Sequence, residues 1–210
     1  MIILKIDPKN PDGRIVKIAA DILKSGGSIV YPTDTAYGLG GNALDEKTIR
    51  KVYEAKGRDF SKPTHVVVRY WQMIEKLTHT NERAKKLYDK FLPGPLTLVL
   101  PKRRIVPNIL PANLPTLGVR IPDSLITQSL SNLLPFPYTT PSAIRSGGKT
   151  PYSIKEVKKE LNFEKVDLIL DAGALPINPP STIINPSSFS LKILREGPIT
   201  KEQIEKALNI

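Results

Sequence analysis

Residues 26–41 read Gly-Gly-Ser-Ile-Val-Tyr-Pro-Thr-Asp-Thr-Ala-Tyr-Gly-Leu-Gly-Gly, and this stretch decides the fold class. Just before it, apolar side chains recur at helical spacing over 14–25, which predicts an amphipathic helix that the glycine pair ends. The apolar run at 28–31 then predicts a strand, and the residues at 32–41 predict a loop. A helix that leads directly into a strand and a polar loop is typical of α/β folds, which place ligand loops after strands.

The rest of the sequence continues this alternation of helices and strands. Further helices are predicted after the capping residues Asp45, Thr80, Asp123, Ser153 and Thr200, and further strands at 66–68, 96–100, 117–121, 166–171, 181–184 and 191–194. No internal repeat, low-complexity tract or Gly/Ser-rich linker divides the chain. We therefore expect a single α/β domain over residues 1–210 with a mixed sheet.

The composition restricts the chemistry that the protein can perform. The 210 residues include no cysteine, which excludes thiol nucleophiles, disulfides, iron–sulfur clusters and zinc ribbons. The only histidines are His65 and His79, so a histidine-rich metal cage is excluded as well. Catalysis must then use carboxylates, hydroxyls, Lys, Arg, backbone groups or a weakly held hard cation.

Charge and hydropathy indicate the class of partner and the compartment. The chain has 31 Lys and Arg against 20 Asp and Glu, and this net charge of +11 favours an anionic partner such as a nucleic acid, a nucleotide or a phosphorylated metabolite. A solvated basic surface is the alternative. The apolar runs are far shorter than the roughly 18 residues of a membrane span, and the N-terminal run is too short for a signal peptide. We expect a cytoplasmic protein without a membrane partner.

Two segments carry residue types that bind phosphate. Ala143–Thr150 ends in Gly-Lys-Thr like a phosphate-binding loop, but a proline follows at once and Ser153 is the better helix cap, so such a loop is not expected. Lys56, which continues the apolar helix face before it, is followed by Arg58 and Lys62, giving three cations in seven residues. They can satisfy a helix end, or bind a polyphosphate, for which Arg supplies a fork and Lys a point charge.

Seven separated motifs resemble the Sua5/YrdC/YciO family. In chain order they are Tyr31-Pro-Thr-Asp-Thr-Ala-Tyr-Gly-Leu-Gly40, Lys56-Gly-Arg58 with Lys62-Pro63, Pro93-Gly-Pro-Leu-Thr97, Val119-Arg-Ile-Pro122, Ser142-Ala143 followed by Ser146-Gly147, Ser181-Thr-Ile183 and Leu194-Arg-Glu-Gly197. The resemblance covers about residues 12–200, and it is specific because all seven motifs agree in order. It implies the short form of the family, a twisted, open, mixed α/β sheet and a large, basic, concave cavity.

The resemblance also implies an activity. Characterised members of the family are L-threonylcarbamoyladenylate synthases, nucleotidyltransferases that form threonylcarbamoyl-AMP and pyrophosphate from L-threonine, bicarbonate and ATP for the t6A modification of tRNA. Such chemistry depends on positioning and cations more than on a nucleophilic side chain, which fits a chain without cysteine. Mg²⁺ would accompany ATP without a dedicated protein metal site. RNA or tRNA and the downstream t6A transferase machinery are further expected partners.

Roles for individual residues follow from the same resemblance. It implies that Lys56 and Arg58 are catalytic and hold the phosphates together with Lys62. It implies that Thr33, Thr35 and Ser181 lie near the threonine, whose carboxylate Arg120 would clamp by a bidentate contact. It further implies that Ser142 and Arg195 bind the nucleotide.

One departure from the family pattern concerns the nucleotide. The family usually reads Thr-Ser-Ala-Asn where this chain reads Pro141-Ser-Ala-Ile144, and Ile offers neither the donor nor the acceptor that Asn would. Thr64 and His65 also stand where an apolar pair is common. The net charge of +11 and Ile144 leave an alternative function open, a non-catalytic RNA-binding paralogue whose affinity for RNA would fall steeply with salt.

Overall fold

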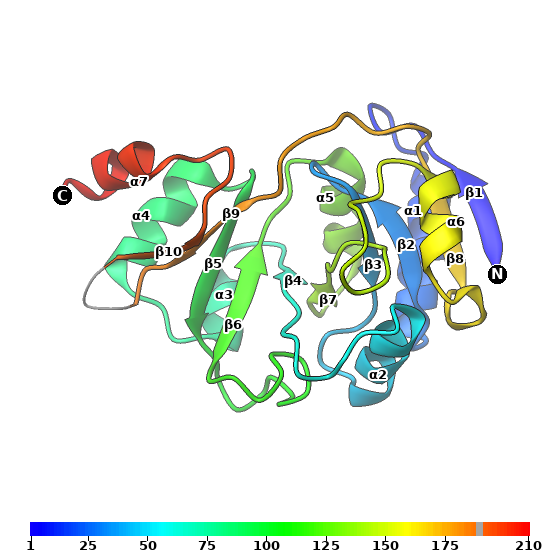
Figure 1. The fold of residues 1–210 in the computed structure, drawn as a ribbon, viewed down its shortest axis with the longest axis horizontal. Helices are drawn as coiled ribbons and strands as arrows, with labels where there is room; N and C mark the ends of the chain where they lie inside the picture. The colour runs from blue at the N-terminus through cyan, green and yellow to red at the C-terminus, as the bar shows by residue number, and fades with distance from the viewer. Residues whose placement is uncertain (188–190) are drawn as a thin grey trace.

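The computed structural model describes residues 1–187 and 191–210. It contains two mixed β-sheets with helices packed around them (Figure 1). In chain order the elements are β1 (Ile2–Lys5), α1 (Gly13–Lys24), β2 (Ile29–Pro32), β3 (Tyr37–Gly40), α2 (Glu46–Ala55), β4 (Val66–Val67), α3 (Trp71–Leu77), α4 (Glu82–Phe91), β5 (Leu96–Pro101), β6 (Thr116–Arg120), α5 (Leu125–Leu133), β7 (Tyr138–Thr139), α6 (Ile154–Glu160), the 3₁₀ turn η1 (Phe163–Lys165), β8 (Leu168–Asp171), β9 (Thr182–Asn185), β10 (Lys192–Arg195) and α7 (Lys201–Leu208). None of the helices in these described residues is long and apolar enough to cross a membrane.

The strands divide into a four-stranded sheet, β1-β8-β2-β3, and a six-stranded sheet, β10-β9-β5-β6-β4-β7. The first sheet is parallel except for β3, and the second mixes parallel and antiparallel pairs. Residues 37–43, which begin with the edge strand β3, pair with residues 137–143 at two isolated bridges, Gly38 to Ser142 and Asn42 to Tyr138, with backbone hydrogen bonds on either side of each bridge. Pro137 and Pro141 have no N–H to donate, so a continuous ladder cannot form there. The predicted α/β class with mixed strands is confirmed, with two sheets in place of the one expected.

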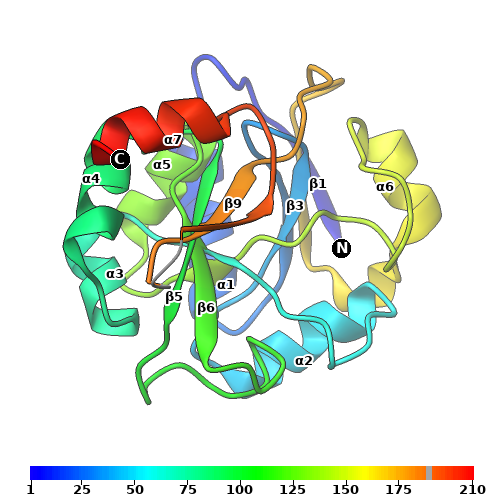
Figure 2. The ribbon, with the colours of Figure 1, turned by 60° about the vertical axis from the view of Figure 1, so that its left-hand side comes forward.

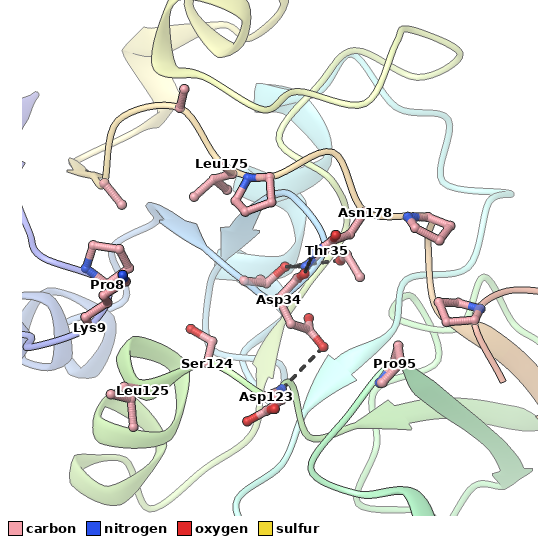
Figure 3. A pocket seen from close by; sticks show the side chains of 16 residues that line it. Pro8, Lys9, Asp34, Thr35, Pro95, Asp123, Ser124, Leu125, Leu175 and Asn178 are labelled. Carbon is pink, nitrogen blue, oxygen red and sulfur yellow. Dashed lines mark hydrogen bonds between the residues drawn. The ribbon is translucent and has the colours of Figure 1, made fainter.

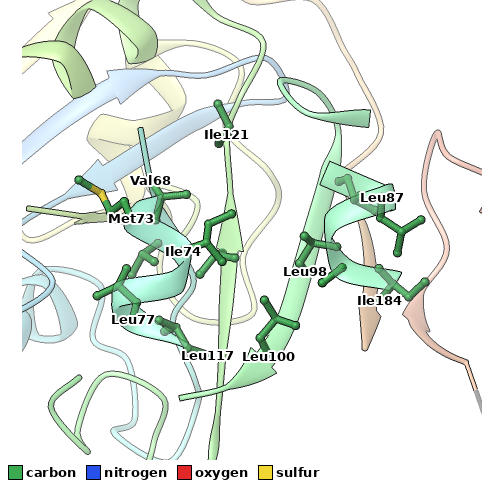
Figure 4. Close-up of a cluster of buried hydrophobic side chains, with 14 of the residues drawn as sticks. Val68, Met73, Ile74, Leu77, Leu87, Leu98, Leu100, Leu117, Ile121 and Ile184 are labelled. Carbon is green, nitrogen blue, oxygen red and sulfur yellow. The ribbon is translucent and has the colours of Figure 1, made fainter. Parts of the chain in front are cut away.

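Helices bury their apolar faces against both sheets. Figure 2 shows α3, α4 and α7 on one side of the six-stranded sheet, and Figure 4 shows Ile74, Leu87 and Leu98 within the core that these elements share. Helices α1 and α5 pack together against β2 and β8, and α2 and α6 contribute to a third cluster around β3. The helix between residues 14 and 25 and the helices capped by Asp45, Ser153 and Thr200 are confirmed.

Two predicted helix caps were wrong by one residue. Asn81, rather than Thr80, caps α4 by accepting the Ala84 N–H at 2.8 Å. Ser124, rather than Asp123, caps α5, and its hydroxyl accepts the Thr127 N–H at 3.5 Å. Helix α6 begins after Ser153, so the Gly-Lys-Thr segment does not open a helix, as expected.

The segment 32–41 was predicted as a loop, but residues Tyr37–Gly40 within it form β3, antiparallel to β2. The glycines that suggested a loop are needed here because β3 lies against the ring of Tyr31 on the neighbouring strand. A Cβ added at Gly38 or Gly40 would lie 3.2 or 3.0 Å from the Tyr31 ring. The two glycines therefore make room for a buried aromatic side chain within the sheet, a use that looks like loop composition in the sequence.

Candidate active site

A cavity of about 210 Å³ lies where the two sheets meet. Five basic side chains line it, and no acidic side chain is among its lining residues; the basic ones are Lys56, Arg58, Arg120, Arg145 and Arg195. Seven of the nine predicted site residues line this cavity, namely Thr35, Lys56, Arg58, Arg120, Ser142, Ser181 and Arg195. The other two lie beside it, Lys62 through a contact with a lining serine and Thr33 in a neighbouring cavity.

Lys56 is buried at the end of α2, as its position on the apolar helix face predicted, and is 2% exposed. Its ammonium group donates to the backbone carbonyls of Ser142 and, at 2.6 Å, of Ile144. Burial, and then the charge of Arg58, lower the pKa of Lys56 to about 7. The two carbonyls favour the charged form and act against this shift. Lys56 therefore holds the 142–144 loop in place through these two carbonyls.

Arg58 and Lys62 supply two further cations near the same loop. The Arg58 guanidinium donates to the carbonyls of Pro63 at 2.8 Å and Lys62 at 3.3 Å, and burial lowers its pKa. The Lys62 ammonium donates to the hydroxyl of Ser146 at 3.0 Å. Gly57, with a φ of +50°, permits the turn between the two cations of the motif. Of the three predicted phosphate-binding cations, Lys56 and Arg58 thus line the cavity, and Lys62 lies beside it at Ser146.

Arg120, at the end of β6, forms a buried ion pair with Asp34. Its Nη2 lies 2.5 Å from the Asp34 carboxylate, and the two side chains are 8% and 10% exposed. Its Nη1 is 3.5 Å from the Thr35 hydroxyl. Sequence reasoning did not assign Asp34 to the site. The signal available for it was its place between Thr33 and Thr35 in the loop that follows β2.

The loop after β2 uses its two threonines differently. The Thr33 hydroxyl accepts the N–H groups of Thr35 and Ala36, each at 3.2 Å, and donates to the Ala36 carbonyl at 2.7 Å. Thr33 therefore stabilises the turn. Thr35 lines both the small cavity and its larger neighbour, where a ligand can reach it.

Ser181 and Arg195 were assigned to different substrates, and the structure places them in direct contact. The Arg195 guanidinium donates to the Ser181 carbonyl from Nη2 at 2.8 Å and from Nε at 3.0 Å, and to its hydroxyl at 3.2 Å. The Ser181 hydroxyl also lies 2.9 Å from that of Thr97, a buried residue that sequence reasoning did not assign. Burial, and then the charge of Arg120, lower the pKa of Arg195.

His65 is a cavity residue that sequence reasoning noticed without giving it a role. Burial lowers its pKa to about 4, and the charges of Arg195, Arg120 and Arg58 add to this effect. The imidazole is therefore neutral at neutral pH. It lies against the backbone of Gly118 on β6, where a Cβ would be only 2.4 Å from its Cδ2.

A second cavity of about 780 Å³ adjoins the first at Thr35 (Figure 3). It lies at the carboxyl ends of the parallel strands β1, β8 and β2, a position where α/β folds commonly bind ligands. Asp34, Asp123 and Asn178 supply polar groups, and much of the remaining lining is proline and leucine. Among the described residues, no group of three or more His, Cys, Asp or Glu side chains is arranged to hold a metal ion.

Comparisons with known proteins give the family and the fold of this chain. The family model Sua5/yciO/yrdC, described as telomere recombination, matches residues 21–197. A putative threonylcarbamoyl-AMP synthase of Methanocaldococcus jannaschii is 39% identical over 206 residues, which cover 97% of each chain. The crystal structure of Pyrococcus abyssi Sua5 complexed with L-threonine superposes with a TM-score of 0.93 at 35% identity, over 99% of this chain and 61% of that one.

The crystal structure of Escherichia coli YciO has a TM-score of 0.84 at 28% identity, over 94% of this chain and 97% of that one. This chain thus matches YciO over nearly all of its length, and the solved Sua5 chain over less than two thirds. The matched region contains every residue of the cavity described above. The chain belongs to the Sua5/YciO/YrdC family.

Proposed function

We propose that this protein is an L-threonylcarbamoyladenylate synthase, which makes threonylcarbamoyl-AMP and pyrophosphate from L-threonine, bicarbonate and ATP. The observation that carries the proposal is the convergence of Arg120, Ser181 and Thr35 with four further cations in one cavity. The likeness to a Sua5 structure that is complexed with L-threonine supports it. A carboxylate, a hydroxyl and a polyphosphate are the groups that such a lining recognises.

The reaction joins a carbamate to the α-phosphorus of ATP. The threonine amine and bicarbonate first give a carbamate and water. A carbamate oxygen then bonds to the α-phosphorus, the bond from that phosphorus to the bridging oxygen breaks, and pyrophosphate leaves with the electron pair. Negative charge on the phosphate oxygens must be stabilised throughout, which fixed cations in a partly desolvated cavity do well.

The residues divide between the two substrates. Arg120 binds the threonine carboxylate, with the hydroxyls of Thr35 and Ser181 beside it. Arg58, Lys62 and Arg195 hold the phosphates, and Ser142 contacts the nucleotide. Lys56 serves this proposal indirectly, since its ammonium group is occupied by the carbonyls of the loop that carries Ser142.

Mg²⁺ fits this site as a companion of ATP rather than as an ion held by the protein. The cavity lining offers cations, hydroxyls and carbonyls and lacks carboxylates, the ligands that hard divalent cations prefer. The phosphates would supply its ligands, and the ion would neutralise charge on the departing pyrophosphate. The residues of the cavity act on the same phosphates from the protein side.

The test is threonine-dependent release of pyrophosphate by the purified protein with ATP, bicarbonate and Mg²⁺. Formation of threonylcarbamoyl-AMP is followed in parallel by mass spectrometry. An Arg120→Ala variant should lose threonine-dependent release, and Arg104→Ala, which removes an exposed arginine outside the cavity, should keep it. Pyrophosphate release that is absent, or equal with and without threonine, would contradict the proposal.

A non-catalytic RNA-binding protein is the second candidate, because the chain carries a net charge of +11 and places Ile144 in the cavity lining. It requires RNA affinity that falls by orders of magnitude over a fourfold increase in salt, without threonine-dependent turnover. Binding of tRNA and contact with the t6A transferase machinery remain predictions for either candidate. A salt-insensitive or absent interaction with RNA would eliminate this second candidate.

A further inference from the structure

We propose that Asp34 is the positioning residue of Arg120, and that it fixes the guanidinium for the carboxylate of the amino-acid substrate. The inference rests on the proposed function, since it concerns how the substrate is recognised. It adds to the site a residue that would not itself touch the substrate. Its basis is the small number of polar contacts that hold Arg120.

The Arg120 guanidinium has one close polar partner among the described residues, the Asp34 carboxylate at 2.5 Å. The contact of Nη1 with the Thr35 hydroxyl, at 3.5 Å, is at the limit of a hydrogen bond. The Nε atom is buried and has no hydrogen-bond partner among residues 1–187 and 191–210. Because the side chain is only 8% exposed, bulk water cannot hold the group in place. Its orientation therefore depends on Asp34.

Asp34 is itself held by contacts from two other loop segments. Its second carboxylate oxygen accepts the backbone N–H of Asp123 at 3.3 Å, at the start of α5, and its backbone carbonyl accepts the Asn178 side-chain amide at 2.8 Å. Figure 3 shows Asp34 between Thr35, Asp123 and Asn178, with the bond to Asp123 drawn. The carboxylate is thus anchored on the side of the larger cavity, while Arg120 reaches toward the smaller one.

This arrangement leaves part of the guanidinium available. An arginine carries five N–H donors, and the ion pair with Asp34 uses one edge of the group at Nη2. The Nη1 end lies toward Thr35, which lines the smaller cavity together with Ser181. A substrate carboxylate entering that cavity would meet a guanidinium that is already oriented. Preorganisation of this kind lowers the cost of binding, since the side chain need not be ordered by the substrate.

The opposite role for Asp34 makes an opposite prediction. If the carboxylate of Asp34 competed with the substrate for Arg120, then removing it would tighten the binding of threonine. If it positions Arg120, removing it weakens the binding of threonine. The sign of the change in affinity therefore decides between the two roles.

The experiment measures the binding of L-threonine and of ATP, by isothermal titration, to the wild-type protein and to Asp34→Ala, Asp34→Asn and Asp34→Glu. We expect Asp34→Ala to raise the Kd for threonine by about tenfold or more, and Asp34→Asn to act in the same direction. Asp34→Glu, which restores a carboxylate, should recover part of the loss. The Kd for ATP should change by less than about twofold, because the loss concerns one guanidinium orientation.

Asp123→Asn is the matched control. It removes the same negative charge from the same larger cavity, and it keeps the backbone N–H through which Asp123 contacts Asp34. We expect wild-type affinity for threonine in this variant. A second control is L-threoninol, which lacks the carboxylate; its affinity, measured in competition if weak, should be equal in the wild type and in Asp34→Ala.

Three results would overturn the inference. They are tighter threonine binding in Asp34→Asn, an equal loss of affinity for threonine, threoninol and ATP, and wild-type affinity in Asp34→Ala. Should Asp34→Ala not fold, the comparison rests on Asp34→Asn, which keeps the side-chain shape and one oxygen acceptor. Failure of the wild-type protein to bind threonine would instead contradict the proposed function, and this outcome is separate from the other three.

Discussion

Replacing Lys56 with methionine tests whether burial of the amine destabilises its protonated form in the folded protein, as the structure indicates. Methionine has a similar length and no charge, so Lys56→Met keeps most of the packing and removes the titrating group. The pKa of Lys56 is lowered from 10.5 to about 7 in the folded protein, mainly by burial. In the unfolded chain the amine returns to its ordinary pKa. Folding and protonation are therefore linked at this residue.

The sign of the linkage follows from which state binds the proton. Above pH 10.5 the amine is neutral in both states, and it contributes no pH dependence. Between pH 10.5 and about 7 the unfolded chain binds a proton that the folded protein does not, so falling pH lowers the free energy of unfolding. The limiting slope is about 1.4 kcal/mol per pH unit. The two carbonyl acceptors stabilise the ammonium and reduce this slope. We therefore expect Lys56 to raise the free energy of unfolding by about 2 to 4 kcal/mol between pH 7 and pH 10.

The assay is urea-induced unfolding of both proteins at pH 7, 8, 9 and 10, followed by the fluorescence of the single tryptophan, Trp71. Taking the difference between wild type and Lys56→Met at each pH cancels the titration of all other groups. That difference should rise with pH in favour of the wild type. A difference that stays constant from pH 7 to pH 10 would show that the Lys56 amine is not desolvated, and would refute the reasoning.

Three further changes test other parts of the site. Arg58→Ala should weaken the use of ATP by about 1.5 to 3 kcal/mol, the scale of charged hydrogen bonds, with little change in melting temperature. Steady-state kinetics, with Arg104→Ala as the control, check this. A large loss of stability with normal turnover would contradict it. Ile144→Asn should tighten ATP binding about threefold to tenfold by adding one hydrogen bond, measured by titration calorimetry, and unchanged affinity would mean that residue 144 does not face the nucleotide. Gly118→Ala should lower the free energy of unfolding by about 1 to 3 kcal/mol, since the new Cβ would lie 2.4 Å from the His65 ring. A variant as stable to urea as the wild type would show that the imidazole moves aside at little cost.

The elements that could be predicted from the sequence are those with strong local signals. The capping boxes of α6 and α7, at Ser153 and Thr200, each join residues three positions apart, so no tertiary information is needed to find them. Helix α3 is as short as α6 but was missed, because its N-cap, Tyr70, makes no side-chain capping bond. Strand β1 was missed because its partner lies far along the chain. Local signals thus account for most of the fold and for none of its long-range pairings.

The same division holds for the site. The inward direction of Lys56 follows from helical spacing with Ile49, and the structure confirms that the side chain is buried. Its partners, the carbonyls of Ser142 and Ile144, are 86 and 88 residues away in the sequence. No local sequence pattern predicts such a contact. The pairing of Asp34 with Arg120 likewise spans 86 residues. Residue types could be read from motifs, whereas the contacts between them required the fold.

The parallel pairing of β1 with β8 has a consequence for how the protein folds during synthesis. Ile2 is paired with Leu168, so the first strand cannot find its partner until most of the chain has been made. At translation rates of about 5 to 20 residues per second, this wait lasts roughly 10 to 30 s. Throughout that interval Ile2 and Ile3 belong to an apolar segment of the nascent chain that has no strand partner, and such segments favour misassociation between chains. We expect co-translational folding to begin elsewhere, around α1 and the β2–β3 hairpin, with β1 among the last strands to pair.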